Sequence, residues 1–94
     1  MAEPRVALIP GGARGIGRAV ALALADDGWR IAIAYRTSRQ DAEAVVAAVQ
    51  ARGCGAVAHQ ADVSQPAVAA GLVAAIRAEW GRIDALVTAA GPYH

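Results

Sequence analysis

Residues 10–17 read Pro-Gly-Gly-Ala-Arg-Gly-Ile-Gly and separate two hydrophobic patterns of different period. The apolar run before them, Arg5 to Ile9, has the length and composition of a buried strand. The run after them, Ile16 to Asp27, has apolar residues at the four-residue spacing of a helix. The predicted buried side of this helix carries Ile16, Val20 and Leu24. The sequence therefore predicts a strand, a glycine-rich turn and a helix in succession.

The remainder of the chain repeats this alternation of strand and helix. The further predicted elements are a strand at Arg30 to Ala34, a helix at Asp41 to Arg52, a strand at Ala56 to Gln60, a helix that ends at Gly81, and a strand at Ile83 to Val87. We expect Ser64 to be the N-cap of the last helix, with Pro66 in its first turn. The order β-α-β-α-β-α-β predicts an α/β fold with a parallel sheet and right-handed crossovers.

Length and composition restrict the possible functions. The 94 residues form at most one small domain, and 56% of them are hydrophobic. A net charge of +1 argues against electrostatic binding to nucleic acid or anionic lipid. The chain has a single cysteine and no apolar run of membrane-spanning length, so we expect a cytoplasmic protein. It also contains no lysine, which excludes lysine chemistry from residues 1–94.

A glycine-rich turn between a first strand and a first helix suits the binding of a diphosphate. Glycines let the backbone turn sharply and approach a ligand, while free N–H groups and the positive helix end stabilise its charge. The alternative interpretation is a tight turn with a purely structural role. The position of residues 10–17 in the predicted fold favours nucleotide binding.

The spacing Gly11-x-x-x-Gly15-x-Gly17 resembles the motif T-G-x-x-x-G-I-G of the short-chain dehydrogenase/reductase family. Asp62-Val63 after the third strand and the sequence 86–91, LVTAAG, also resemble motifs of this family, as does the lead-in Trp80 to Asp84. The resemblance covers the whole chain. It implies a Rossmann-type doubly wound sheet in the order 3-2-1-4, truncated to four strands and three helices. Residues 1–94 would be a partial NAD(P)-binding domain of an oxidoreductase that transfers hydride between a nicotinamide cofactor and a carbonyl or alcohol substrate.

The residues after the second strand predict the choice of cofactor. A carboxylate there would hold the ribose 2′-hydroxyl of NAD, but the chain has Tyr35 followed by Arg36. Arg36 and Arg14 are suited to a 2′-phosphate, and Thr37 and Ser38 add hydroxyl donors. We therefore expect NADP(H) to be preferred over NAD(H). The alternative is that both arginines are merely solvated.

The resemblance assigns the remaining cofactor contacts residue by residue. Asp62 would accept a hydrogen bond from the adenine amino group, with Val63 packed nearby; the alternative for Asp62 is a turn-forming role before a helix. The full set of expected cofactor-binding residues is Gly11, Arg14, Gly15, Ile16, Gly17, Tyr35, Arg36, Thr37, Ser38, Asp62, Val63, Ala89, Ala90 and Gly91. No metal ligands are expected.

Some residues depart from the family's pattern. Pro10 replaces the threonine of the glycine motif, which removes a hydroxyl and a backbone donor. Thr88 and Ala89 replace two asparagines that brace the central sheet in the family. The family's catalytic Ser and its Y-x-x-x-K pair would lie beyond the fourth strand, and the sequence as given ends at His94. We therefore expect no catalytic residue, and no activity of these residues alone.

Two expectations follow from the truncated sheet. The strand at 83–87 would form an open apolar edge, which predicts a homo-oligomer or a complementing chain that covers it. An alternative function is a standalone nucleotide-binding or interaction module that completes its sheet with a partner chain. A degenerate remnant and a flavodoxin-like phosphate binder are further alternatives; the last would explain the glycine turn but not Asp62-Val63.

Overall fold

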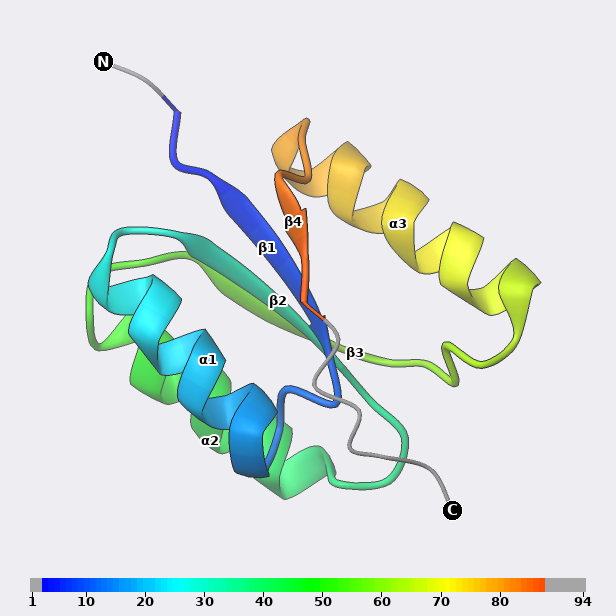
Figure 1. Cartoon of the computed structure of the whole chain (residues 1–94), viewed down its shortest axis with the longest axis horizontal. Helices are drawn as coiled ribbons and strands as arrows, with labels where there is room; N and C mark the ends of the chain where they lie inside the picture. The colour runs from blue at the N-terminus through cyan, green and yellow to red at the C-terminus, as the bar shows by residue number, and fades with distance from the viewer. Residues whose placement is uncertain (1–2, 88–94) are drawn as a thin grey trace.

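A parallel four-stranded sheet with three helices forms the molecule, in a computed structural model that describes residues 3–87 (Figure 1). The elements are β1 (Val6–Pro10), α1 (Gly15–Asp26), β2 (Arg30–Tyr35), α2 (Arg39–Gln50), β3 (Ala56–Gln60), α3 (Pro66–Trp80) and β4 (Ala85–Leu86). The strand order is β3-β2-β1-β4, which confirms the predicted Rossmann-type arrangement. Most element boundaries lie within two residues of their predicted positions.

The two central strands are buried on both faces of the sheet. Val6 to Ile9 of β1 and Ile31 to Ala34 of β2 are all buried. The strands pair in parallel, with Val6 opposite Arg30 and Pro10 opposite Ala34. Continuous apolar runs of this kind are typical of parallel strands covered on both sides, which explains why they lack hydrophobic alternation.

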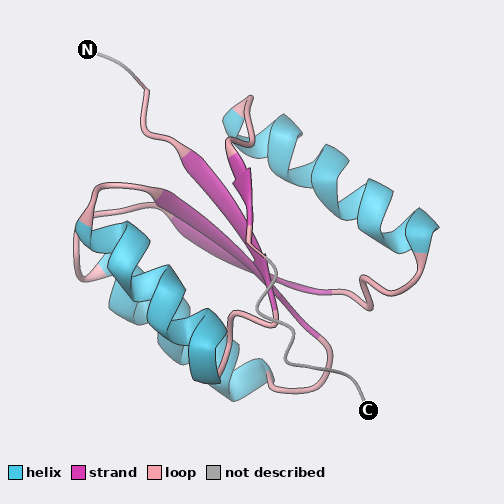
Figure 2. Ribbon diagram, viewed as in Figure 1, coloured by secondary structure: helices cyan, strands magenta, loops and turns pink. Residues whose placement is uncertain are grey.

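Helices α1 and α2 cover one face of the sheet and α3 covers the other (Figure 2). Alternate residues of β1 point to the two sides: Ala7 and Ile9 pack under α1 and α2, whereas Val6 and Leu8 pack under α3. Right-handed crossovers place consecutive parallel strands and their helices in this way.

The predicted buried face of α1 is wrong by one residue. Ile16 is 71% exposed, and the buried residues of the helix are Gly17, Ala21 and Ala25. These small residues have the same four-residue spacing as the predicted set, so periodicity could not separate the two. The helix places its small residues against the sheet and lies close to it, while Val20 and Leu24 pack partly buried at the side.

The predicted N-cap of α3 is also wrong. Gln65 is the N-cap residue and makes no side-chain capping bond, and Pro66 is the first helical residue. The Ser64 hydroxyl donates instead to the Asp62 carboxylate at 2.6 Å, and the Ser64 backbone N–H donates to the same oxygen at 3.1 Å. This local turn uses the hydroxyl that would otherwise cap the helix.

Strand β4 is shorter than predicted and has a partner on one side only within residues 3–87. Ala85 and Leu86 pair with Ala7 and Leu8 of β1, and Leu86 is 61% exposed. Association through this edge remains a prediction. No helix in the described part of the chain is long and apolar enough to cross a membrane.

Candidate functional site

The glycine loop after β1 is fixed to the sheet by its own backbone. Gly11 has a φ of +74°, which favours glycine, and its N–H donates to the carbonyl oxygen of Ala34 at 2.9 Å. The Gly12 N–H donates to the carbonyl oxygen of Ile9 at 3.1 Å. Although Pro10 lacks an N–H, the two following residues hold the loop against β1 and β2.

Two further glycines are required by close approach. A Cβ added to Gly17 would overlap the carbonyl oxygen of Gly11 and lie 2.8 Å from the Cα of Gly12. A Cβ on Gly12 would overlap the Ile33 side chain and lie 2.9 Å from the Ile9 carbonyl oxygen. The first turn of α1 therefore rests directly on the loop, which leaves the backbone of both segments unobstructed by side chains.

The N-terminus of α1 offers free backbone donors beside this loop. The helix begins at Gly15, where φ is +59°, and its N-cap residue Arg14 makes no side-chain capping bond. The N–H groups of Gly15, Ile16 and Gly17 have no hydrogen-bond partner within residues 3–87, as expected in a first helical turn. Such a cluster of donors at the positive end of a helix can bind a diphosphate.

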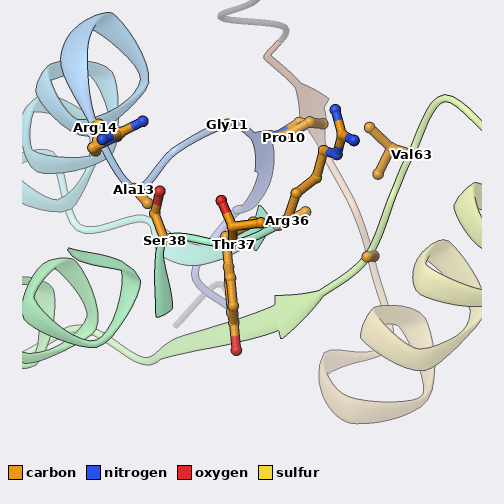
Figure 3. Close-up of a pocket in the computed structure, with 11 residues that line it drawn as sticks. Pro10, Gly11, Ala13, Arg14, Arg36, Thr37, Ser38 and Val63 are labelled. Carbon is orange, nitrogen blue, oxygen red and sulfur yellow. The ribbon is translucent and has the colours of Figure 1, made fainter. Parts of the chain in front are cut away.

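A cleft of about 640 Å³ opens at the carboxyl ends of β1 and β2 beside the glycine loop (Figure 3). Its lining residues are Pro10, Gly11, Ala13, Arg14, Ala34, Tyr35, Arg36, Thr37, Ser38, Ala61 and Val63. Ligands of open parallel sheets bind at this position, where the crossover connections on either side of β1 diverge. The cleft and the first turn of α1 thus bring together the loop and strand-end residues that the sequence predicted.

The polar groups of the cleft come from its two sides. Figure 3 shows Arg14 on the side of α1 and Arg36 on the opposite side near Pro10 and Val63, with the hydroxyls of Thr37 and Ser38 between them in the view. Of the described residues that line the cleft, two are arginines and none is an aspartate or glutamate. This charge pattern suits an anionic ligand.

Asp62 lies next to the cleft rather than in its lining. Hydrogen bonds from the Ser64 hydroxyl and N–H lower the pKa of Asp62, and the positive charge of Arg36 lowers it further. The lowered pKa favours the ionised carboxylate, which is a stronger acceptor for an amino group than the neutral acid. Val63, the next residue, lines the cleft.

Many of the predicted cofactor-binding residues lie close together, and some residues of the cleft were not predicted. Gly15, Ile16 and Gly17 form the adjoining helix turn, while Ala89, Ala90 and Gly91 lie outside the described residues. Sequence reasoning did not predict the lining residues Pro10, Ala13, Ala34 and Ala61. It also missed Gln60, whose side-chain Nε2 donates to the Arg36 carbonyl oxygen at 3.0 Å and ties the ends of β2 and β3 together. Its polarity at a strand end was the available signal.

Comparison with known proteins gives consistent matches. A family model described as short chain dehydrogenase matches residues 5–94. An uncharacterized oxidoreductase of Methylorubrum extorquens is 47% identical over 91 residues, and a 3-oxoacyl-(acyl-carrier-protein) reductase of Staphylococcus aureus is 37% identical over 91 residues. Each match covers 97% of this chain and 37% of the relative. The chain thus spans little more than a third of the length of these relatives.

Solved structures agree with the observed fold. The acetoin dehydrogenase from Enterobacter cloacae matches with a TM-score of 0.90 and 32% identity, over 100% of this chain and 37% of that one. A Burkholderia cenocepacia dehydrogenase with bound NADP matches with a TM-score of 0.86 and 34% identity, over 90% of this chain and 33% of that one. An NAD⁺-bound xylitol dehydrogenase matches with a TM-score of 0.81 and 33% identity, over 87% of this chain and 31% of that one. On its sequence motifs, its sheet order and these matches, the chain belongs to the short chain dehydrogenase family.

Proposed function

We propose that residues 1–94 form the cofactor-binding part of a cytoplasmic short chain dehydrogenase and bind NADP(H) in preference to NAD(H). The observation that carries this proposal is the cleft at the ends of β1 and β2, which is lined by Arg14 and Arg36 and by no carboxylate among the described residues. Family members are known with either cofactor, since the neighbours include one with bound NADP and one with bound NAD⁺. The preference therefore depends on this chain's own residues.

Three parts of the cofactor, the diphosphate, the 2′-phosphate and the adenine, can be assigned to residues of this site. The N–H groups at the start of α1 suit the diphosphate, because they have no partner among residues 3–87 and lie at the positive end of the helix. Arg36 suits the 2′-phosphate, because its guanidinium can donate two parallel hydrogen bonds. Asp62 and Val63 suit the adenine, because Val63 lines the cleft and Asp62 carries an ionised carboxylate beside it.

The proposed reaction is hydride transfer between the nicotinamide and a carbonyl or alcohol substrate. The bound cofactor would supply the hydride to a carbonyl or accept it from an alcohol, while the residues of this chain bind and orient the cofactor. None of the residues 1–94 is proposed to donate the proton, because the family's Ser and Y-x-x-x-K groups have no counterpart in this sequence. We propose that the rest of the active site belongs to polypeptide equivalent to the part of the relatives that this chain does not span.

A second candidate is a nucleotide-binding module that has no catalysis of its own and completes its sheet with a partner chain. The observation that favours it is the exposed Leu86 on β4, which within residues 3–87 pairs only with β1. An unpaired apolar strand edge is a template for another strand. Copurification of a chain that carries Y-x-x-x-K would favour this candidate.

The cofactor preference is tested by replacing Arg36 with alanine. Loss of a charge-assisted contact to phosphate weakens NADPH binding about tenfold, while NADH binding changes little. Fluorescence titration with each nucleotide measures both affinities. The matched control is Arg39→Ala, which removes the same charge three residues later, from an exposed side chain that pairs with Glu43 outside the cleft lining. Equal losses for NADPH and NADH, or equal effects of the two variants, would contradict the proposed role of Arg36.

A further inference from the structure

One ion pair joins the two helices that begin beside the cleft. The Nε of Arg14 lies 3.8 Å from an Oδ atom of Asp41. Arg14 is the N-cap residue of α1 and Asp41 lies in the first turn of α2. The pair therefore connects the glycine loop to α2, at the side of the cleft on which Arg14 is seen in Figure 3.

This ion pair is weak enough for another anion to replace Asp41 as the partner of Arg14. Its side chains are 74% and 52% exposed, so the attraction is screened by water and weak. The separation of 3.8 Å is longer than a good charge-assisted hydrogen bond. The carboxylate approaches Nε, and the terminal nitrogens of the guanidinium make no hydrogen bond within residues 3–87. A phosphate dianion that enters the cleft can bind those nitrogens and compete with Asp41 for the same cation.

We propose that Asp41 is a specificity-determining residue of the cofactor cleft, because it is the internal counterion of Arg14 and competes with the 2′-phosphate of the cofactor. The inference rests on the proposed function and extends the site of the 2′-phosphate from Arg36 to Arg14, the second arginine of the cleft lining. Asp41 lowers the affinity for NADP(H) in two ways: it occupies Arg14 in the free chain, and its charge repels the bound phosphate. It has little effect on NAD(H), which carries no charge at the 2′ position.

The chain contains a matched control for this proposal. Glu43 is a second exposed acid on α2, two residues after Asp41, and it pairs with Arg39 at 3.3 Å within the same helix. Neither Glu43 nor Arg39 lines the cleft. Neutralising Glu43 therefore changes the net charge as neutralising Asp41 does, but leaves Arg14 paired.

The experiment compares Asp41→Asn and Glu43→Gln by isothermal titration with adenosine 2′,5′-bisphosphate and with adenosine 5′-monophosphate, which differ only in the 2′-phosphate. Asp41→Asn should tighten binding of the bisphosphate by about 2- to 5-fold, the size expected when an exposed ion pair is lost. Binding of the monophosphate should stay within error, and Glu43→Gln should change neither affinity by as much. Asp41→Ser, which keeps a helix-compatible polar side chain, serves as a second variant, and circular dichroism checks that all variants fold alike.

The outcomes separate this inference from the proposed function. If the unsubstituted chain binds the bisphosphate more tightly than the monophosphate but Asp41→Asn does not tighten it, the role of Asp41 is wrong and the cofactor preference stands. If the unsubstituted chain does not distinguish the two ligands, the preference for NADP(H) and the role of Asp41 are both wrong. Equal tightening of both ligands would also overturn the inference, since it would show a general charge effect.

Discussion

Single glycines decide whether the loop and the first helix can meet. Gly17 lies against Gly11 and Gly12 so closely that no side chain fits between them. The predicted buried set of α1 omitted Gly17 because a glycine contributes nothing to a hydrophobic pattern. The motif spacing singled out the same residue, whose close approach to the loop is observed and whose role in nucleotide binding stays a prediction.

Gly17→Ala should therefore disrupt the cofactor site. The added methyl group would overlap the Gly11 carbonyl oxygen, so the loop must move away from the helix, and we expect NADPH binding to fall at least tenfold with a loss of stability. Titration with NADPH and denaturant unfolding measure the two effects.

Gly71 provides a control, because the same substitution there should raise the stability rather than lower it. It lies exposed within α3, and a Cβ there would meet no atom within 4 Å. Gly71→Ala should stabilise the chain by roughly 0.5–1 kcal/mol, since alanine loses less backbone entropy than glycine in a helix. Unchanged NADPH binding in Gly17→Ala would contradict the close-approach argument.

The contacts of two other residues could not be predicted from the sequence, although the polarity of Gln60 at a strand end was a signal. Asp41 and Gln60 act through tertiary contacts. Asp41 joins the first turn of α2 to Arg14 at the start of α1, and Gln60 joins the end of β3 to the backbone of Arg36 after β2. Neither residue belongs to a motif. Their partners are 27 and 24 positions away, and only the folded sheet brings them together.

At the scale of elements, Asp84 fastens β4 to the centre of the sheet. Its carboxylate accepts a hydrogen bond from the Val6 N–H at 2.8 Å, and its own N–H donates to the Val6 carbonyl oxygen at 2.8 Å. The Arg82 guanidinium holds the same carboxylate with two hydrogen bonds, at 2.6 and 2.8 Å. The sequence predicted a strand here from its apolar residues alone, whereas the contacts that anchor it come from the polar residues just before it.

Asp84 should make the free energy of unfolding depend on pH in the acid range. The bonds from Arg82, and then the bond from Val6, lower the pKa of Asp84 below its ordinary value of 3.8. A carboxyl group with a lowered pKa contributes stability that is fully present above the unfolded-state value and is lost as the pH falls through the folded-state value. Asp84→Asn should thus be less stable than the unsubstituted chain at neutral pH, and the difference should shrink below pH 3.8.

Denaturant unfolding at neutral and acid pH measures this difference. Asp27→Asn is the control, because Asp27 is exposed and its side chain makes no hydrogen bond or ion pair within residues 3–87. A destabilisation by Asp84→Asn that stays constant down to strongly acid pH would show that its effect is not due to the charge.

At the scale of the whole molecule, the order of strands and helices was predictable and the exact packing was not. Buried parallel strands appear in the sequence as continuous apolar runs, such as Ile31 to Ala34, so the number and order of strands followed directly. The sheet order came from the family resemblance and is confirmed. The face of α1 and the cap of α3 were mispredicted because close backbone contact and a local turn compete with simple periodicity.

The arrangement places the glycine loop, the start of α1 and the end of β2 around one cleft at the carboxyl edge of the sheet. The opposite edge carries a different surface, around Gly28 and Gly53, which includes the half-buried Cys54. If the cleft is the cofactor site, a dinucleotide binds at the carboxyl edge of the sheet and not at the opposite edge.

The most direct test is an NMR titration of the chain with NADPH and, separately, with NADH, in which every backbone amide is monitored. We predict that NADPH shifts the signals of residues 11–17 and 35–38 and does so at lower concentration than NADH. Signals of Gly28, Gly53 and their neighbours on the opposite edge should stay in place and report that the fold is unchanged. Shifts centred on those residues, or no shifts in the cleft at saturating NADPH, would contradict the assignment of this chain as the cofactor-binding part of a dehydrogenase.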